Sequence, residues 1–370
     1  MKSIIYVGMD VHTTNFTLSC YAVENDMSFA TVQVAPDYKN ILKYLEKVND
    51  NSGGDCEFLC GYEAGCLGFT LYEDLKRHNI QCVVLAPTSI PSKKNEIKTD
   101  KRDAVKIAKC LAYNTYSAVH IPTKEDSDVK EYIRMRDAHK EALKKVKQQI
   151  LAFCTRHGLR FSEGKSYWTQ KHLSWLKTLK IDGLQREILN EYLATYMQDT
   201  DKIERFDKRI AELAQGEKYA QKVKMLSCMI GIRTHTALAL IAETGDFRRF
   251  KKAEQYAAFL GLVPGEHSSG DGQNRLGITK AGNNHLRRLL VEAAQCYSRG
   301  KVGYKSKGLK VRQYGNPAEI IAYADKANDR LRRKYYRMVM TMNKKHNVAV
   351  AAIARELACF VWGMMTEHTA

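Results

Sequence analysis

Hydrophobic positions in the first 115 residues alternate between short strand-like runs and longer amphipathic segments. Glu24-Asn25-Asp26 has the composition of a turn between two strands, and Asp37 has the character of a helix start. The expected strands are Ile4–Met9, Phe16–Val23, Phe29–Val34, Glu57–Tyr62 and Cys82–Leu85. One expected helix begins at Asp37, and two more cover Phe69–Arg77 and Asp100–Tyr113. This order of elements predicts an α/β domain.

Three antiparallel strands followed by two parallel ones is the order of an RNase H-like sheet, in which the first and fourth strands are neighbours. Asp10 follows the first strand and Glu63 follows the fourth, so we expect them to face each other. Asp100 and Asp103 are three residues apart and share one helix face. Clustered carboxylates are hard oxygen ligands that suit Mg²⁺ or Mn²⁺. The alternative is four ordinary surface acids.

From residue 126 the pattern becomes helical, with basic residues between the apolar ones. One expected long helix has apolar residues from Val129 to Phe153, and a second covers Gln185–Leu213. A short helix with tryptophan, Tyr167–Leu179, lies between them in sequence. This pattern predicts an antiparallel helical hairpin or coiled coil. Its irregular spacing disfavours a long heptad zipper. Oligomerisation and a solvated spacer both remain open.

Positive charge is concentrated in the C-terminal part of the chain. The whole chain has a formal net charge of +18, and residues 226–370 hold 24 Lys+Arg against 11 Asp+Glu, a net of +13. This balance favours a polyanionic partner. The turn at Leu226–Thr234, followed by the helical Ala237–Glu243, resembles a helix-hairpin-helix start that could hold a phosphate. A glycine that only lies between two packed core helices would give the same sequence pattern, so this alternative remains open.

A Gly-rich segment, Gly261–Gly272, contains Ser268 and Ser269 and precedes a helix. A serine exposed among cations that neutralise phosphates suits a nucleophile. The candidate phosphate-binding cations are Arg275, Lys280, Arg287 and Arg288. On composition alone, a solvated turn is the favoured explanation of this segment.

Ten scattered cysteines, several of them in apolar runs, argue against a disulfide scaffold. The N-terminus lacks the pattern of a secretion signal, since Asp10 interrupts its apolar run early. The apolar run Val348–Met365 contains Arg355 and Glu356, so we expect a packed helix and not a membrane span. We therefore expect a reduced, cytoplasmic protein with no membrane partner.

Together these motifs resemble the DEDD transposases of the IS-110 type of insertion sequence, with the Piv DNA invertases as relatives. The segments that carry the resemblance are Gly8–His12, Glu63–Gly65, Thr99–Ala104, Gly261–Leu290 and Lys345–Met365. One departure is Thr13, because many relatives have Lys at that position. This difference affects a possible phosphate contact and leaves the acidic residues intact.

The resemblance implies three parts: a RuvC-like (RNase H-like) domain at residues 1–125, a helical hairpin at 126–220 and a mainly α-helical transposase domain at 221–370. It also implies a site-specific recombinase that cuts and rejoins DNA through a phosphoserine. The nucleophile aligns with Ser269, and Asp10, Glu63, Asp100 and Asp103 would hold Mg²⁺ or Mn²⁺. The implied partners are donor and target double-stranded DNA, a structured bridge RNA that guides the reaction, and further copies of the chain in a homodimer or homotetramer.

Three other functions remain open from the sequence. A RuvC-like nuclease of the Holliday-junction type would need the four acids without Ser269. A Piv-like invertase would use the same chemistry on a different DNA arrangement. A nucleic-acid-binding protein without catalytic activity would need only the positive charge.

Overall fold

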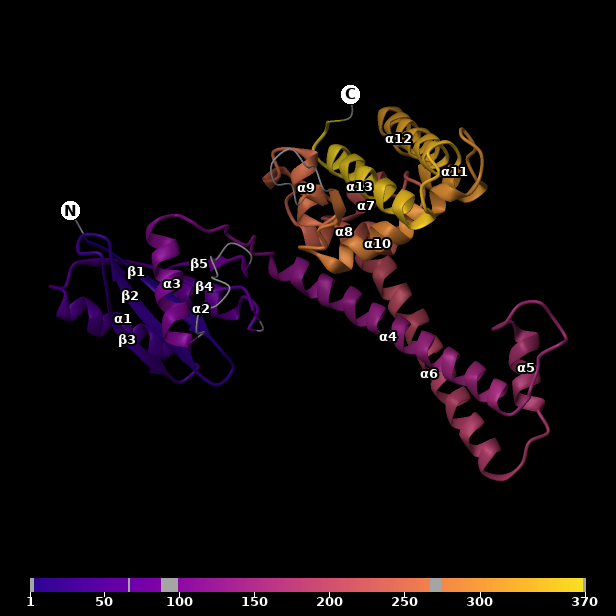
Figure 1. Cartoon of the computed structure of the whole chain (residues 1–370), viewed down its shortest axis with the longest axis horizontal. Helices are drawn as coiled ribbons and strands as arrows, with labels where there is room; N and C mark the ends of the chain where they lie inside the picture. The colour runs from indigo at the N-terminus through magenta and orange to yellow at the C-terminus, as the bar shows by residue number, and fades with distance from the viewer. Residues whose placement is uncertain (1–2, 66, 88–98, 267–274, 369–370) are drawn as a thin grey trace. The chain divides into compact units, whose positions relative to one another are not determined.

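The computed structural model of the chain describes residues 3–65, 67–87, 99–266 and 275–368 (Figure 1). The chain divides into two compact units, Met1–Ile121 and Pro122–Ala370. Each unit has its own hydrophobic core. The helical hairpin expected at residues 126–220 lies in the second unit, and the three-part domain boundaries stay a prediction.

The first unit contains one mixed five-stranded sheet with the order β3-β2-β1-β4-β5. Strand β1 pairs antiparallel with β2 and parallel with β4. The strands are β1 (Ser3–Val11), β2 (Phe16–Ala22), β3 (Met27–Val34), β4 (Cys56–Glu63) and β5 (Gln81–Leu85). The helices are α1 (Tyr38–Asn51), α2 (Thr70–Arg77) and α3 (Asp100–Ala112). This arrangement confirms the RNase H-like fold and the pairing of the first and fourth strands.

Alternation along β1 and β4 sends side chains to the two faces of the sheet. Val7 and Met9 of β1, with Cys60 and Tyr62 of β4, share a core with α1 and α2. Tyr6 of β1 instead packs with residues of α3 on the opposite face. Both faces are therefore covered by helices, as a sheet with parallel strands requires.

Close packing of α3 against β1 depends on Gly8. A Cβ atom at this position would lie 1.9 Å from the carbonyl oxygen of Ala104 and 2.4 Å from the backbone nitrogen of Ala108. Both atoms belong to α3, and neither can move independently of the helix. The missing side chain therefore sets how closely α3 approaches the strand.

The second unit begins with two long helices, α4 (Lys124–Arg156) and α6 (Gly183–Leu213), which pack side by side as a hairpin (Figure 1). The short helix α5 (Gln170–Thr178) lies between them in sequence and closes the far end. There Ile150 and Phe153 of α4 form a small core with Leu176 of α5 and Leu193 of α6. The expected hairpin is thus present with its linker helix.

The remaining elements of the second unit are mainly helical and share one core. The helices are α7 (Ala220–Leu226), α8 (Thr234–Thr244), α9 (Ala253–Phe259), α10 (Asn284–Gln295), α11 (Lys307–Gln313), α12 (Ala318–Tyr336) and α13 (His346–Met365). Short turns are η2 (Phe247–Arg249), η3 (Cys296–Ser298) and the π-helical η4 (Arg337–Thr341). A small hairpin joins β6 (Pro264–Glu266) to β7 (Arg275–Ile278).

The turn between α7 and α8 is buried in this core. Gly231 has a φ of 83°, and a Cβ there would lie 2.3 Å from the carbonyl oxygen of Ala293. The backbone N–H of Ile230 donates to the side-chain oxygen of Asn328 at 2.9 Å. Packing therefore accounts for this glycine without a bound phosphate.

Helix α13 is long and apolar enough to cross a membrane by composition alone, but 56% of its most apolar window is buried inside the protein. Ile353, Leu357 and Val361 are fully buried in the core of the second unit. The helix thus has a role in core packing, as its sequence predicts.

Replacement of Gly8 should destabilise the first unit. In Gly8→Ala the new methyl group has no space beside α3, so we expect the free energy of unfolding to fall by at least about 2 kcal/mol. Urea denaturation monitored by circular dichroism measures this loss. Gly65→Ala is the matched control, since its Cβ would have an ordinary contact of 3.8 Å. Equal unfolding midpoints for the two variants would contradict the packing argument.

Candidate active site

Asp10 and Glu63 lie at matching ends of two parallel neighbours, β1 and β4. Each comes one residue after the last registered pair, Met9 and Tyr62. By alternation Asp10 shares the sheet face of Tyr6 and Gly8, and Glu63 shares the face of Gly61. A Cβ on Gly61 would touch Leu111 of α3. Both acids therefore belong to the face that α3 covers.

Helix α3 begins at this edge of the sheet. Thr99 is its N-cap, and the Thr99 hydroxyl accepts a hydrogen bond from the backbone N–H of Arg102 at 3.4 Å. Asp100 and Asp103 both lie in the first turn, where the helix dipole favours negative charge. The packing at Gly8 brings this turn toward Asp10.

Asp10, His12 and Asp100 form a group of potential metal ligands. One ligand atom from each lies within 4.8 Å of the other two. The His12 Nε2 atom is 3.4 Å from an Asp10 carboxylate oxygen. His12 had not been singled out as a ligand from the sequence, although it stands two residues after Asp10. Glu63 and Asp103 lie at the same edge without belonging to this close group.

Electrostatic strain at Asp10 indicates what the group would bind. Burial raises the pKa of Asp10, His12 lowers it, and the charges of Asp100 and Asp103 raise it again. A carboxylate destabilised by burial and by like charges gains from a nearby cation. The donors are mostly hard carboxylate oxygens with one imidazole, a set that fits a divalent ion such as Mg²⁺ or Mn²⁺.

The proposed nucleophile, Ser269, and its neighbour Ser268 lie outside the described residues. The segment that contains them connects β6 to β7, and these strands pair through Pro264 with Ile278 and through Glu266 with Arg275. Behind the hairpin, the backbone N–H of Lys280 donates to Gly261 at 3.1 Å. The two strands thus hold the ends of this segment together. We call the β6–β7 pair the serine hairpin, because Ser268 and Ser269 lie between the two strands in sequence.

The predicted phosphate-binding cations differ in their surroundings. Lys280 is exposed and lies just after β7, the strand that begins at Arg275. Arg287 donates to the Leu260 carbonyl oxygen at 2.9 Å. Arg288 pairs with Asp137 at 2.6 Å and with Glu292 at 3.0 Å. Both guanidinium groups on α10 therefore have protein partners and only part of their donors free.

Arg288 borders a buried ionic network that the sequence does not predict. His285 of α10 contacts a carboxylate at each ring nitrogen: Nδ1 is 2.5 Å from Glu243, and Nε2 is 2.8 Å from Asp137. Glu243 of α8 also accepts two hydrogen bonds from Arg134 and one from Asn283. The Asp137 and Glu243 side chains are only 6% and 1% exposed.

These contacts define the protonation state of His285. Carboxylates accept hydrogen bonds and do not donate them when ionised, so both ring nitrogens must carry a proton. Burial alone would lower the pKa of His285, but Asp137 and Glu243 outweigh it and raise the pKa above its usual value. Burial acts to raise the pKa of Glu243, yet His285, Arg134 and Asn283 hold it down to about 2.

The network ties helix α4 to the start of helix α10, which follows strand β7 along the chain. Asp137 belongs to α4, and its carboxylate also lies 3.0 Å from Nε2 of His235 on α8. Asn283 caps α10 and donates to Glu243 at 2.7 Å. A shallow pocket of about 340 Å³ opens over Asp137, His285 and Arg288. One charged cluster thereby fixes α4, α8 and α10 together.

An RNase H-like sheet with carboxylates at the end of β1 and at the start of α3 is typical of one class of proteins: enzymes that cut nucleic-acid strands with bound metal ions. Comparison with protein families is more specific. The family model for DEDD transposases of the IS110 type matches residues 7–157, and the model for the transposase IS116/IS110/IS902 family matches residues 223–307.

Individual relatives agree with these matches. The chain is 35% identical over 308 residues to the putative transposase y4qE of Sinorhizobium fredii, covering 83% of this chain and 75% of that one. It is 30% identical over 339 residues to the transposase for insertion sequence element IS1533 of Leptospira borgpetersenii, covering 90% and 96%. The chain belongs to the IS110-type transposase family and is a DNA-cutting and rejoining enzyme.

The charge on His285 predicts a pH-dependent stability. Its folded pKa is raised, so its contribution is complete below about pH 6.5, the value in an unfolded chain, and is lost as pH rises through the folded pKa. His285→Gln should lower the free energy of unfolding by about 2 kcal/mol or more at pH 6 and by less at pH 9. Urea denaturation at several pH values measures the difference.

His78→Gln is the control for this comparison, because His78 is exposed on the first unit and its replacement should cost little at either pH. A destabilisation by His285→Gln that stays constant from pH 6 to pH 9 would show that the ring is not charged in the folded protein.

Proposed function

We propose that this transposase moves DNA through a covalent phosphoserine intermediate, with Ser269 as the nucleophile and a divalent metal ion held by acidic residues of the first unit. The observation that supports its metal-dependent part is the meeting of Asp10 with Asp100 at the edge of an RNase H-like sheet, while the serine rests on the resemblance of Gly261–Leu290 to the family. Glu63 and Asp103 complete the acidic set at the same edge.

The metal ligands would be Asp10, Glu63, Asp100 and Asp103, with His12 close enough to take part. A bound Mg²⁺ or Mn²⁺ would supply Lewis-acid polarisation of the scissile phosphate. The protein's own part is to hold the four carboxylates in place by strand pairing and by the packing of α3. His12, whose Nε2 atom is 3.4 Å from the Asp10 carboxylate, would help to orient it.

In the proposed step, the Ser269 oxygen forms a bond to phosphorus while the bond from phosphorus to one neighbouring sugar oxygen breaks. The serine proton leaves, and the released sugar oxygen takes up a proton to become a hydroxyl group. The cut strand then remains on the protein as a phosphodiester, so the energy of the broken bond is kept for rejoining. Attack by a strand-end hydroxyl reverses the step and releases the serine.

Arg275, Lys280, Arg287 and Arg288 are proposed as phosphate contacts around this serine. Lys280 is exposed close to the hairpin, in keeping with this role. Arg288 has a second function in the ion pair with Asp137. Such contacts position a DNA strand without reading its sequence.

Selection of the DNA sites would then rest on a bridge RNA that pairs with donor and target DNA, as base pairing does in other guided systems. The acids and Ser269 belong to different units of the chain, so a composite site between protomers of a homodimer or homotetramer is consistent with the proposal. It would keep a single protomer inactive until assembly. We expect the protein to act in the cytoplasm, at DNA.

A trapped protein–DNA adduct tests the proposal most directly. Wild-type protein incubated with labelled donor and target DNA, guide RNA and Mg²⁺ should yield a covalent adduct on a denaturing gel. Ser269→Ala should bind DNA and RNA normally but form no adduct, because the attacking oxygen is missing. Ser268→Ala is the matched neighbour and should keep part of the activity.

Peptide mass spectrometry of the adduct locates the attached nucleotide. A nucleotide attached through its phosphate to Ser268 would shift the assignment of the nucleophile by one residue. Free cut ends without an adduct would support a Holliday-junction type of nuclease, and an active Ser269→Ala enzyme would refute the serine mechanism.

A further inference from the structure

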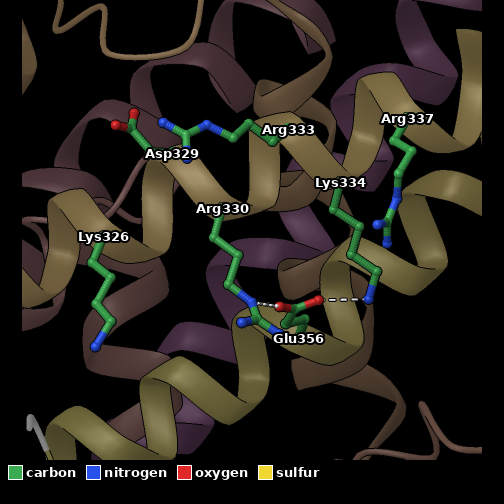
Figure 2. Close-up of a pocket in the computed structure, with 7 residues that line it drawn as sticks. All are labelled: Lys326, Asp329, Arg330, Arg333, Lys334, Arg337 and Glu356. Atoms are coloured by element: carbon green, nitrogen blue, oxygen red, sulfur yellow. Dashed lines mark hydrogen bonds and ion pairs between the residues drawn. The ribbon is translucent and has the colours of Figure 1, made fainter.

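Helix α12 presents a row of basic side chains on one face. A hollow of about 610 Å³, shown in Figure 2, is lined by Lys326, Arg330, Arg333 and Lys334 of α12 and by Arg337, the first residue of η4. Their spacing of four, three, one and three residues places them along one side of the helix. The opposite side, with Tyr323, Ala327 and Leu331, is buried in the core.

Glu356 of α13 fixes two of these cations. Its carboxylate pairs with Arg330 and with Lys334, as the dashed lines in Figure 2 show. Burial acts to raise the pKa of Glu356, but Lys334 and Arg330 lower it, so the carboxylate stays ionised. Arg330 nevertheless remains 68% exposed. Glu356 thus holds the two side chains in place without removing Arg330 from solvent.

The other three cations remain exposed. Lys326, Arg333 and Arg337 make no recorded ion pair within the described part of the chain. The Asp329 carboxylate accepts a hydrogen bond from the backbone N–H of Gly303 at 2.8 Å, which anchors a neighbouring loop. Five cations and two carboxylates line the hollow, so its net charge is +3.

Helix-end electrostatics explain only part of this row. Arg333 and Lys334 lie in the last turn of α12, where cations interact favourably with the helix dipole. Arg330 lies one turn earlier and Lys326 two turns earlier, where that effect has faded. A solvated face is the remaining alternative, but it does not account for a hollow lined only by charged residues or for the partly buried Glu356 carboxylate that pairs with two of them.

We propose that this face of α12 binds the phosphate backbone of duplex DNA, as a second DNA contact apart from the serine hairpin. From Lys326 to Arg337 the row is about 16 Å long at 1.5 Å per residue. A DNA strand carries one phosphate per about 3.4 Å of axis, so several phosphates lie within its reach. Arginine suits this role because its planar donors match phosphate oxygens.

DNA is the polyanion on which the family acts, and this favours DNA over RNA as the occupant. The inference rests on the DNA-cutting function and not on the phosphoserine step. Binding can be measured without cleavage, so a failure here and a failure of the serine mechanism are distinguishable. A surface of this kind would position DNA without selecting its sequence.

The first test measures how the affinity of the full-length protein for a labelled random-sequence DNA duplex depends on salt concentration. Fluorescence anisotropy reports the binding. The triple variant Lys326→Gln/Arg333→Gln/Arg337→Gln should weaken binding and make the plot of log affinity against log salt shallower by about two to three units. The matched control is Lys171→Gln/Lys177→Gln/Lys180→Gln, which removes the same charge from exposed positions on and after α5. An equal loss in both triples, or an unchanged slope in the first, would overturn the proposal.

The second test identifies the occupant in the complete reaction. The photo-crosslinking residue p-benzoylphenylalanine at position 333 should attach to labelled DNA when both DNA and guide RNA are present. Attachment to the RNA instead would overturn the assignment to DNA, and attachment to neither would show that this face is not an interface.

Discussion

The contact between β1 and α3 at Gly8 is the constraint on which the acidic site depends. The helix backbone lies where a Cβ on residue 8 would stand, so only glycine allows this approach. Two residues later the strand carries Asp10, and the first turn of the same helix carries Asp100 and Asp103. Parallel pairing of β1 with β4 brings Glu63, the last residue of β4, to the same edge of the sheet. The four acids come from three separate elements, and strand pairing together with the close packing of α3 sets where those elements meet.

In the second unit, buried charged groups fix the positions of helices α4, α8 and α10, whereas in the first unit close backbone packing positions α3. His285 bridges the carboxylates of Asp137 and Glu243, which are nearly inaccessible to solvent. Buried ionic groups of this kind contribute little net stability when compared with apolar residues, but the loss of one partner leaves an unpaired charge and is costly. The network therefore acts mainly to specify one arrangement of α4, α8 and α10. Through Asn283 it also fixes the N-terminus of α10, the helix that follows the β6–β7 hairpin along the chain.

The sequence predicted the sheet well because its strands are short apolar runs bounded by turn residues, and strand order follows from the order of elements. It also predicted the acidic edge, since Asp10 and Glu63 follow directly on buried strands. It did not predict the network. Asp137 and His285 are 148 residues apart, and each looks like an ordinary polar residue on a helix. Only the packing of α4 against α8 and α10 brings them together, and sequence periodicity carries no information about such contacts. For the same reason Arg288 was predicted only as a phosphate contact.

The proposed role of Asp10 is to bind a metal ion that DNA cutting requires, and a change of ligand type tests this role most directly. Asp10→Cys replaces a hard carboxylate oxygen by a softer sulfur, which binds Mg²⁺ poorly and accepts softer ions such as Mn²⁺ or Cd²⁺. DNA cleavage should be lost in Mg²⁺ and regained when Mn²⁺ or Cd²⁺ is added, with DNA binding retained throughout. Full activity in Mg²⁺, or no recovery in the softer metals despite normal DNA binding, would contradict the role of Asp10 as a metal ligand.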